Sequence, residues 1–444
     1  MIEETKITKL GVIGAGPVGL VTSAGFASLE NEVMCVESNQ AILSDVSSGK
    51  VPIFEPELEN LVNKCIKNQK LQFTDQIKDV LEFAEVIFIC VGTPQAEDGK
   101  ADLRQIESVA IDIAENLHGY KLLVEKSTVP IGTHIRLKNT MSRHVNGKIG
   151  FDIACVPEFL REGNAVKDFF NPDRVILGIE SENSKKLLQD IYKDFECPKI
   201  WTNPATAELI KYASNGFLAM KISYSNMLAD ICEATGADVD SLIEGIGQDS
   251  RIGKAFINPG VGYGGSCLPK DVSAFIDIFD QNNVNNGLLK EVDSINRLRP
   301  HRIITKLKSS IKNLENKRIA VWGLAFKPNT DDVRNAPSLE VVSKLIEEQV
   351  TVNCHDPQAI NQFKKVLNKN TNLTFFDDMY ESAQDCDALI ILTEWPDYLA
   401  TNLDELKAKM SNPLIVDGRG IFKPSEVQKS GFEYKAFGLK ENNN

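Results

Sequence analysis

The sequence predicts an α/β protein with two doubly wound parallel-sheet domains joined by a long central helix. Three observations lead to this prediction. Short apolar runs alternate with helical stretches through residues 7–201. A long helical pattern then spans residues 204–236. The alternating pattern returns between residues 317 and 420, which indicates that the α/β architecture is duplicated.

The first apolar run, residues 7–13, is followed by a glycine-rich turn and a helical stretch. A second run, residues 33–36, ends in Glu37, so an acid follows GxGxxG by about 20 residues, as in Rossmann-like dinucleotide-binding domains. The turn residues are Gly14, Gly16, Pro17, Val18 and Gly19. Glycines let a pyrophosphate approach a helix N-terminus, and the acid binds a ribose diol. Glu37 favours NAD over NADP, because a 2′-phosphate would meet a like charge. The alternative is a turn that binds no nucleotide.

Further candidate ligand contacts follow the ends of other predicted strands, because ligands of parallel sheets gather at the carboxyl ends of strands. The predicted strands lie at 85–94, 121–133, 152–156 and 174–179, with a short one near 198–201. On spacing alone, Glu158 and Glu162 could equally be helix caps. The candidates at these ends are Gly92, Thr93, Pro94, Ser127, Thr128, Glu158, Phe159, Leu160 and Glu162.

The long helix has Asn203 as a plausible N-cap, proline at its first position and Gly236 as a stop signal. Its length suggests that it links two domains or forms a subunit interface. Lys211 and Asn215 share a face; the lysine is either a surface ammonium or points into a cleft between domains. Apolar residues predict one buried face at positions 209, 210, 217, 218, 222, 227, 228 and 231.

Residues 256–271 hold four glycines around Cys267, with Lys270 and Asp271 just after it. Glycines at this density let the backbone come close to a ligand or adopt positive φ. A nearby lysine can favour the thiolate, which is the nucleophilic form of cysteine. The alternative is a glycine-rich turn whose cysteine is a small buried hydrophobe.

The second α/β region echoes the first at residues 317–326, 350–357, 388–396 and 414–420. Asp356 takes the place of Glu37, but GxGxxG is lost and Phe326-Lys327-Pro328 stands in its stead. Arg334 and Arg419 lie near predicted strand ends. We therefore expect this region to bind a different ligand, one with phosphates to neutralise.

A net charge of −13 argues against nucleic acid or an anionic membrane as a partner. The nine cysteines are scattered without CxxC or metal-type pairing, which favours reduced thiols in the cytosol and no metal site. The charged N-terminus opens no long apolar segment, so neither a signal peptide nor a membrane span is expected. We expect a soluble, cytoplasmic protein.

The motifs suit two kinds of oxidation by NAD. Taking hydride from an alcohol needs a base but no cysteine. Oxidising an aldehyde to an acid benefits from a thiolate, which adds to the carbonyl, gives up hydride and forms a thioester that water cleaves. Since the five histidines lie outside these motifs, the proton transfers fall to Lys211, Glu158 and Asp271.

The chain resembles the UDP-glucose 6-dehydrogenases of the UDP-glucose/GDP-mannose dehydrogenase family. The shared motifs run in order from GxGxxG through VGTP, STVPIGT, PEFLREG, AELIKYASN, DSRIG, GYGGSCLPKD and GLAFKPNTDDVR to DGR. The resemblance implies an NAD domain at 1–203, a central helical dimer core at 204–312 and a sugar-nucleotide domain at 313–440. The asparagine-rich tail, 441–444, is expected to be disordered. The resemblance to the family also implies two successive oxidations at C6 of the sugar, with two NAD molecules and Cys267 as the nucleophile.

The resemblance also implies roles for individual residues. Lys211 and Asn215 would stabilise an oxyanion or activate water, Asp271 would assist as base, and Thr128 and Glu158 would order the catalytic water. Cofactor contacts from elsewhere in the chain would be Glu162, Lys270 and Arg334. The sugar-nucleotide site would comprise Phe159, Leu160, Arg251, Lys327, Arg419 and the loop Asn258–Gly264, including Gly260 and Tyr263. In this family the arginine matching Arg251 often comes from the neighbouring subunit.

Four positions depart from the family pattern: Val156 where asparagine is usual, Glu37 where aspartate is commoner, Ile42 where a basic residue is frequent, and Leu298 where a glutamine is frequent. The RIG segment and the GYGG form of the loop favour UDP-glucose, but GDP-mannose, a UDP-N-acetylhexosamine or a UDP-galactose type of substrate stays open. The motifs also allow a two-electron alcohol dehydrogenase with an idle Cys267, or a nucleotide-binding protein without turnover.

Overall fold

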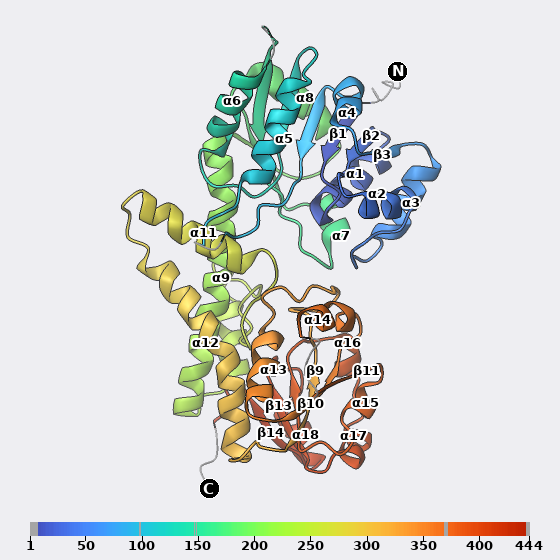
Figure 1. The fold of residues 1–444 in the computed structure, drawn as a ribbon. Helices are drawn as coiled ribbons and strands as arrows, with labels where there is room; N and C mark the ends of the chain where they lie inside the picture. Colours follow the sequence, from blue (N-terminus) through green and yellow to red (C-terminus); the bar gives the residue numbers. More distant parts are fainter. Residues whose placement is uncertain (1–7, 97–98, 146, 148, 368–371, 441–444) are drawn as a thin grey trace. The chain divides into compact units, whose positions relative to one another are not determined.

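The computed structural model describes residues 8–96, 99–145, 147, 149–367 and 372–440 (Figure 1). The chain divides into two compact units, with the boundary between Ser214 and Asn215. Helix α9, Pro204–Thr235, begins in the first unit and ends in the second. The tail at 441–444, predicted to be disordered, lies outside the described residues.

The first unit contains an eight-stranded sheet of order β3-β2-β1-β4-β5-β6-β7-β8 within the described chain. Its strands are β1 Lys9–Ile13, β2 Glu32–Val36, β3 Leu71–Thr74, β4 Val86–Ile89, β5 Lys121–Glu125, β6 Phe151–Cys155, β7 Val175–Gly178 and β8 Lys199–Thr202. The order matches the predicted doubly wound architecture. One detail differs from the predicted parallel sheet, because β7 pairs antiparallel to β6 and β8 runs parallel to β7. The segment after β6 returns into β7 at the same edge of the sheet, without crossing it.

Helices cover both faces of this sheet, which explains why its central strands are apolar throughout. In β4, Val86 and Phe88 pack into one hydrophobic cluster, whereas Ile87 and Ile89 pack into another. The helices are α1 Pro17–Ser28, α2 Gln40–Ser47, α3 Leu58–Lys67, α4 Ile77–Phe83, α5 Arg104–Glu115, α6 Thr133–His144, α7 Ala165–Phe170 and α8 Glu182–Ile191.

The second unit contains a parallel six-stranded sheet of order β11-β10-β9-β12-β13-β14 in the part of the chain that the structure describes. Its strands are β9 Arg318–Trp322, β10 Thr351–His355, β11 Leu373–Phe376, β12 Ala388–Ile391, β13 Leu414–Asp417 and β14 Glu433–Ala436. The order repeats that of the first six strands, which confirms the predicted duplication.

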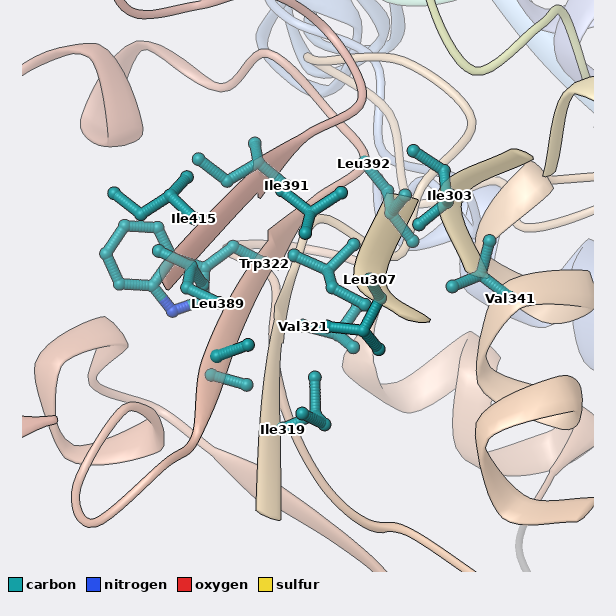
Figure 2. Close-up of a cluster of buried hydrophobic side chains, with 14 of the residues drawn as sticks. Ile303, Leu307, Ile319, Val321, Trp322, Val341, Leu389, Ile391, Leu392 and Ile415 are labelled. Atoms are coloured by element: carbon teal, nitrogen blue, oxygen red, sulfur yellow. The ribbon is translucent and has the colours of Figure 1, made fainter. Parts of the chain in front are cut away.

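Helices of the second unit complete its core. Figure 2 shows Ile303 and Leu307 of α12 and Val341 of α13 beside the strand residues Val321 and Ile319. The helices are α10 Val239–Gly247, α11 Leu268–Gln281, α12 Gly287–Ser310, α13 Pro337–Glu347, α14 Ile360–Val366, α15 Met379–Ser382, α16 Pro396–Leu399, α17 Leu403–Lys409 and α18 Pro424–Lys429. Among the described residues, no helix combines the length and apolarity needed to cross a bilayer.

The prediction for the buried face of α9 is wrong in part. Leu209, Phe217, Met227 and Ile231 are 39, 58, 47 and 53% exposed. The buried side is made instead by small and polar residues, which allow close packing and hydrogen bonding within each unit. They include Ala207, Glu208, Lys211, Asn215, Ala219, Ser223 and Asn226.

Candidate active site

The turn between β1 and α1 contains two glycines that the fold requires and a third, Gly16, that is open to a ligand. Gly14 has φ +102°, and a Cβ there would lie 3.0 Å from the Cys90 carbonyl oxygen. A Cβ on Gly19 would lie 1.8 Å from the Gly14 carbonyl oxygen, so both positions are required by the fold. Gly16, the N-cap of α1, has no heavy atom within 4 Å of its virtual Cβ. The open backbone at this helix N-terminus fits a pyrophosphate.

Glu37 follows β2 and supports the same turn. Its Oε2 accepts a hydrogen bond from the Ala15 N–H at 3.1 Å, and its Oε1 accepts one from the Asn39 N–H at 2.8 Å. The side chain is half-buried. A carboxylate has about four acceptor positions, so Glu37 retains capacity for a ribose diol. The residues present therefore fit NAD.

The ends of β4 and β5 are tied together. The Thr93 hydroxyl donates to the Thr128 carbonyl oxygen at 2.7 Å, and the Ser127 hydroxyl donates to the Val91 carbonyl oxygen at 2.7 Å. Both predicted loops thus lie side by side at the carboxyl edge of the sheet. The Thr93 and Ser127 hydroxyls thus fix the backbone of the two loops.

Glu158 and Lys211 form a buried ion pair within the first unit. Lys211 Nζ lies 3.2 Å from Glu158 Oε1, and the two residues are 4 and 7% exposed. Glu158 Oε2 accepts a hydrogen bond from the Leu160 N–H at 2.6 Å. Burial rules out a surface ammonium for Lys211, and Glu158 both caps its turn and pairs with the lysine. Such a pair can hold or pass a proton away from bulk water.

Phe159 lies between two cations. The Arg174 guanidinium is 4.0 Å from the centre of its ring, and Lys211 Nζ is 5.2 Å from it. Farther along this segment, Glu55 accepts hydrogen bonds from the Gly163 and Ala165 N–H groups at 2.6 and 2.8 Å. Glu55 therefore fixes the turn that carries Glu162.

Two charged residues that the sequence interpretation missed lie at the end of β5. Burial lowers the pKa of Lys126, while nearby Glu158 opposes that shift. Glu125 is fully buried, and among the described residues neither of its carboxylate oxygens has a hydrogen-bond partner. Burial, reinforced by Glu208, raises the pKa of Glu125 well above its usual value, which favours the protonated form of this side chain. Charge inside an otherwise apolar strand was the available signal.

In the second unit, Cys267 is the N-cap of α11 and is half-buried. Its Sγ lies 3.5 Å from the Ser266 Oγ. Seven of the nine cysteines are buried and all are free, so Cys267 departs from the pattern of a core thiol. The positive end of the helix dipole favours a thiolate at this position.

Asp271 lies one turn after Cys267 on α11 and is 1% exposed. Its Oδ2 accepts a hydrogen bond from Asn215 Nδ2 at 2.6 Å, and its Oδ1 pairs with Lys270. Positions four apart share a helix face. The thiol, the carboxylate and the amide of Asn215 therefore belong to one local group within the second unit.

The fold itself requires the glycines before Cys267, and two of them, Gly262 and Gly265, have the positive φ that the sequence suggested. A Cβ on Gly260 would lie 3.0 Å from the Gly418 carbonyl oxygen. Added to Gly262, it would lie 2.7 Å from Asn296 Oδ1, and added to Gly264, 2.3 Å from the Asn335 carbonyl oxygen. Gly265 has φ +84° and faces the Phe326 ring. Each glycine permits close packing against protein atoms.

The cations expected to meet phosphate already have partners. Arg251 pairs with Asp249 and Arg334 with Asp332, each at the arginine's exposed end. Arg419 donates from Nε to the Leu392 carbonyl oxygen at 2.8 Å and from Nη2 to that of Phe326 at 3.0 Å. An anionic ligand would have to compete with these acceptors. Lys327 is half-buried, with Nζ 5.3 Å from the centre of the Phe326 ring, and Asn258 is exposed.

The residues that depart from the family pattern differ in how deeply they are buried. Val156 is buried, and its carbonyl oxygen accepts a hydrogen bond from Lys126 Nζ at 3.4 Å. Ile42 lies in the first turn of α2, where Asn39 caps its N–H. Leu298 is 58% exposed, whereas its neighbour Arg299 is buried.

Comparison with known proteins agrees with this geometry along the whole chain. Family models match residues 8–196 (UDP-glucose/GDP-mannose dehydrogenase family, NAD binding domain), 205–298 (central domain) and 320–424 (UDP binding domain). UDP-glucose 6-dehydrogenase TuaD of Bacillus subtilis is 39% identical over 430 residues, covering 97% of this chain and 93% of the relative.

Solved structures are similar over nearly the full length. A UDP-glucose dehydrogenase from Pyrobaculum islandicum is 34% identical with a TM-score of 0.92, covering 99% of each chain. A UDP-D-ManNAc dehydrogenase from Pyrococcus horikoshii is 28% identical with a TM-score of 0.86, covering 97% of this chain and 99% of that one. The glycine turn that fits NAD, the thiol at a helix N-terminus and these matches agree, and the chain belongs to the UDP-glucose/GDP-mannose dehydrogenase family of NAD-dependent sugar-nucleotide dehydrogenases.

Proposed function

We propose that the protein oxidises the C6 alcohol of UDP-glucose to UDP-glucuronate in two NAD-dependent steps, with Cys267 as the nucleophile of the second. The observation that carries this proposal is the half-buried Cys267 thiol at the N-terminus of α11, one turn from the buried Asp271–Asn215 pair. A simple alcohol dehydrogenase has no use for such a thiol. The 39% identity to a UDP-glucose 6-dehydrogenase supports the choice of sugar.

The first step converts the alcohol to an aldehyde. Bound NAD supplies the hydride acceptor, held by the Gly14–Gly19 turn and Glu37, with Gly92, Thr93, Pro94, Ser127, Glu162, Lys270 and Arg334 as further proposed contacts. The alcohol proton passes to Asp271, whose Oδ2 lies against Asn215. Lys211, paired with Glu158, stabilises the developing oxyanion.

The second step oxidises the aldehyde to an acid. The Cys267 thiolate adds to C6 and forms a hemithioacetal, which loses a second hydride and becomes a thioester. Water then attacks C6, the C–S bond breaks, the carboxylate product leaves, and the Cys267 thiolate is regenerated. Glu158 accepts the proton of that water, with Thr128 helping to position it. In sum, one alcohol, one water and two NAD would give one carboxylate, two NADH and three protons.

The sugar nucleotide is proposed to contact Phe159, Leu160, Arg251, Lys327, Arg419 and the loop Asn258–Gly264. Alternative substrates are GDP-mannose, UDP-galactose or a UDP-N-acetylhexosamine, since a relative at 28% identity is named for UDP-D-ManNAc. The division into regions 1–203, 204–312 and 313–440 stays a prediction.

The deciding experiment measures NADH formed per UDP-glucose consumed, with GDP-mannose and UDP-N-acetylmannosamine in parallel. We expect two NADH per UDP-glucose. One NADH would mean a simple alcohol dehydrogenase with an idle Cys267. Turnover of another sugar nucleotide alone would keep the mechanism and overturn the substrate. No NADH with any sugar nucleotide, despite NAD binding, would favour a protein without turnover.

We also propose that the chain forms at least a homodimer through α9. In the second unit, Phe217, Tyr224, Met227 and Ile231 are 58, 50, 47 and 53% exposed. Their spacing of seven, three and four residues puts them on one helix face, as in a helix-pairing seam. Phe217→Asp with Met227→Asp should shift the sedimentation coefficient towards a monomer. A wild-type monomer at all concentrations would contradict this proposal. We further propose a cytoplasmic location, because all nine cysteines are free.

A further inference from the structure

We propose that Asn226, Asn296 and Arg299 are positioning residues that hold the loop Phe256–Gly265 in its binding shape before the sugar nucleotide arrives. Here this segment is called the substrate loop. The inference rests on the proposed function, because that function assigns the loop to the sugar nucleotide. All of these residues belong to the second unit.

The Gly260 residue is held through both of its backbone polar groups. Its N–H donates to Asn226 Oδ1 at 2.8 Å, and its carbonyl oxygen accepts a hydrogen bond from Arg299 Nε at 3.2 Å. Asn226 is fully buried on α9, and Arg299 is 1% exposed on α12. Two buried side chains from different helices therefore hold Gly260.

Asn296 holds Tyr263 in the same manner. Its Oδ1 accepts a hydrogen bond from the Tyr263 N–H at 2.8 Å, and its Nδ2 donates to the Tyr263 carbonyl oxygen at 3.0 Å. Gly262 has φ +101° and lies against Asn296 Oδ1, so only glycine fits beside this amide. One asparagine therefore fixes both the position and the orientation of the backbone at Tyr263.

The opposite side of the substrate loop is bonded to loops of the second sheet. The Val261 N–H donates to the Gly418 carbonyl oxygen at 2.8 Å, and the Gly265 N–H donates to that of Arg334 at 2.8 Å. Arg419 Nη1 donates to the Gly262 carbonyl oxygen at 3.3 Å. Hydrogen bonds to helices, at Gly260 and Tyr263, and to loops of the second sheet, at Val261, Gly262 and Gly265, therefore hold the substrate loop along its length.

Arg299 is itself fixed on two sides. Its Nη1 lies 2.6 Å from Asp230 Oδ1, and its guanidinium stacks on Phe437 at 4.0 Å from the ring centre. An arginine held this firmly can impose a position on Gly260 rather than adapt to it. Because the substrate loop leads within two residues from Gly265 to Cys267, the same hydrogen bonds also set the position of the thiol.

A binding loop ordered in advance avoids the entropy cost of ordering at each binding event. The proposal predicts that the loop is already protected in the protein without ligand. Hydrogen exchange measured by mass spectrometry should show slow exchange at the Gly260, Val261, Tyr263 and Gly265 amides. Exchange as fast as in exposed loops would overturn the proposal.

The variant test compares Asn296→Ala with Asn296→Asp and with the control Asn282→Ala, which removes an exposed amide at the end of α11. Losing two hydrogen bonds should raise the KM for UDP-glucose about tenfold and speed exchange in the loop. The KM for NAD should not change. Asn296→Asp keeps the acceptor for the Tyr263 N–H and should recover part of the loss. Unchanged KM and unchanged exchange in Asn296→Ala would overturn the proposal.

Two readouts separate this inference from the proposed function. The affinity for UDP can be measured by calorimetry without turnover, and the rate of Cys267 alkylation by iodoacetamide can be followed in a Cys197→Ser background, since Cys197 is the other half-buried thiol. If UDP-glucose is not oxidised but Asn296→Ala alters exchange and alkylation, the positioning role stands and the substrate assignment fails. If Asn296→Ala changes neither, the positioning role fails alone.

Discussion

The first six strands of the larger sheet have the same order as the six strands of the second sheet, yet the turns after β1 and β9 differ in what they can bind. After β1, Gly14 packs against Cys90 just beyond β4; after β9, Gly323 has φ +93° and packs against Thr393 just beyond β12. At both positions a Cβ would lie too close to the residues that follow the neighbouring strand. Only the first turn continues with a second glycine, Gly16, whose virtual Cβ meets open space.

The acids at the ends of the second strands differ more sharply. Glu37 accepts two backbone hydrogen bonds within the described chain and is half-buried. Asp356, at the equivalent place after β10, is 2% exposed. It accepts from the N–H groups of Leu324, Ala325, Gln358 and Ala359 and from Trp395 Nε1.

A carboxylate with five donors has no acceptor position left for a ribose diol. An acid at the same topological position therefore keeps acceptor capacity for a ligand in the first copy, whereas in the second copy its capacity is used up by the turn that it stabilises. Unused hydrogen-bonding capacity, rather than the presence of the acid, distinguishes the two.

The Cys267→Ser substitution tests the chemical step without altering either turn, and we expect it to have the largest effect of the variants considered. Acid production should fall by roughly a thousandfold or more, because a serine hydroxyl is a far weaker nucleophile at neutral pH. NAD binding, measured by fluorescence titration, should stay at the wild-type level. Unchanged acid production would remove Cys267 from the mechanism, and Cys197→Ser serves as the control.

Asp356→Ala should destabilise the second unit by roughly 3–5 kcal/mol, because five buried or partly buried donors lose their acceptor. The affinity for NAD should stay within about twofold, since the first turn is untouched. Denaturant unfolding and NAD titration measure the two quantities, with the exposed Asp377→Ala as control. A loss of NAD affinity without loss of stability would contradict the structural role.

Glu37→Ala should show the opposite pattern. The KM for NAD should rise about 10- to 100-fold, as expected for losing hydrogen bonds to a charged group, with little change in the unfolding midpoint. Gly16→Ala, which meets no protein atom, should likewise weaken NAD binding without destabilising the fold. Gly14→Ala is the matched control and should destabilise, because its φ is +102°. Unaltered NAD kinetics in both Glu37→Ala and Gly16→Ala would exclude this turn as the cofactor site.

The smallest expected effect concerns the acids at the ends of β5 and β13. Glu125 has no hydrogen-bond partner among the described residues, whereas Asp417 accepts from four backbone N–H groups and the Tyr434 hydroxyl. Burial raises the pKa of Glu125, so the folded state keeps a proton that the unfolded chain loses above about pH 4.5. Stability contributed by this site therefore falls as pH rises above that value.

Glu125→Gln should accordingly stabilise the protein by about 1 kcal/mol or more at pH 8 and by nothing at pH 4, measured by denaturant unfolding across this range. The exposed Glu196→Gln should show no such trend. Asp417→Asn should destabilise at pH 8, because it removes acceptors that are in use. The opposite trend, in which the stability of Glu125→Gln relative to wild type decreases from pH 4 to pH 8, would mean that Glu125 is charged in the folded protein.

The fold and the cofactor turn were predictable because their signals are local. Apolar runs of strand length, helical stretches between them and GxGxxG followed by Glu37 involve residues close in the chain, and the backbone geometry they require is specific. The duplication was also readable, since the second copy repeats the same runs. Cys267, Lys270 and Asp271 lie within five positions of one another, so the sequence alone indicated that they are close together; that they lie at the start of one helix, α11, was not predicted.

Tertiary structure alone decided which groups are buried and which hydrogen bonds are already made. Burial of Lys211 against Glu158, the direction of β7, the exposed apolar face of α9 and the raised pKa of Glu125 depend on residues far apart in the chain. The glycines before Cys267 look the same in sequence whether they face a ligand or Asn296 and Phe326. The sequence by itself determined the elements and the cofactor turn; packing decided the state of each polar group, because burial and hydrogen-bond saturation are set by neighbours that only the folded chain brings together.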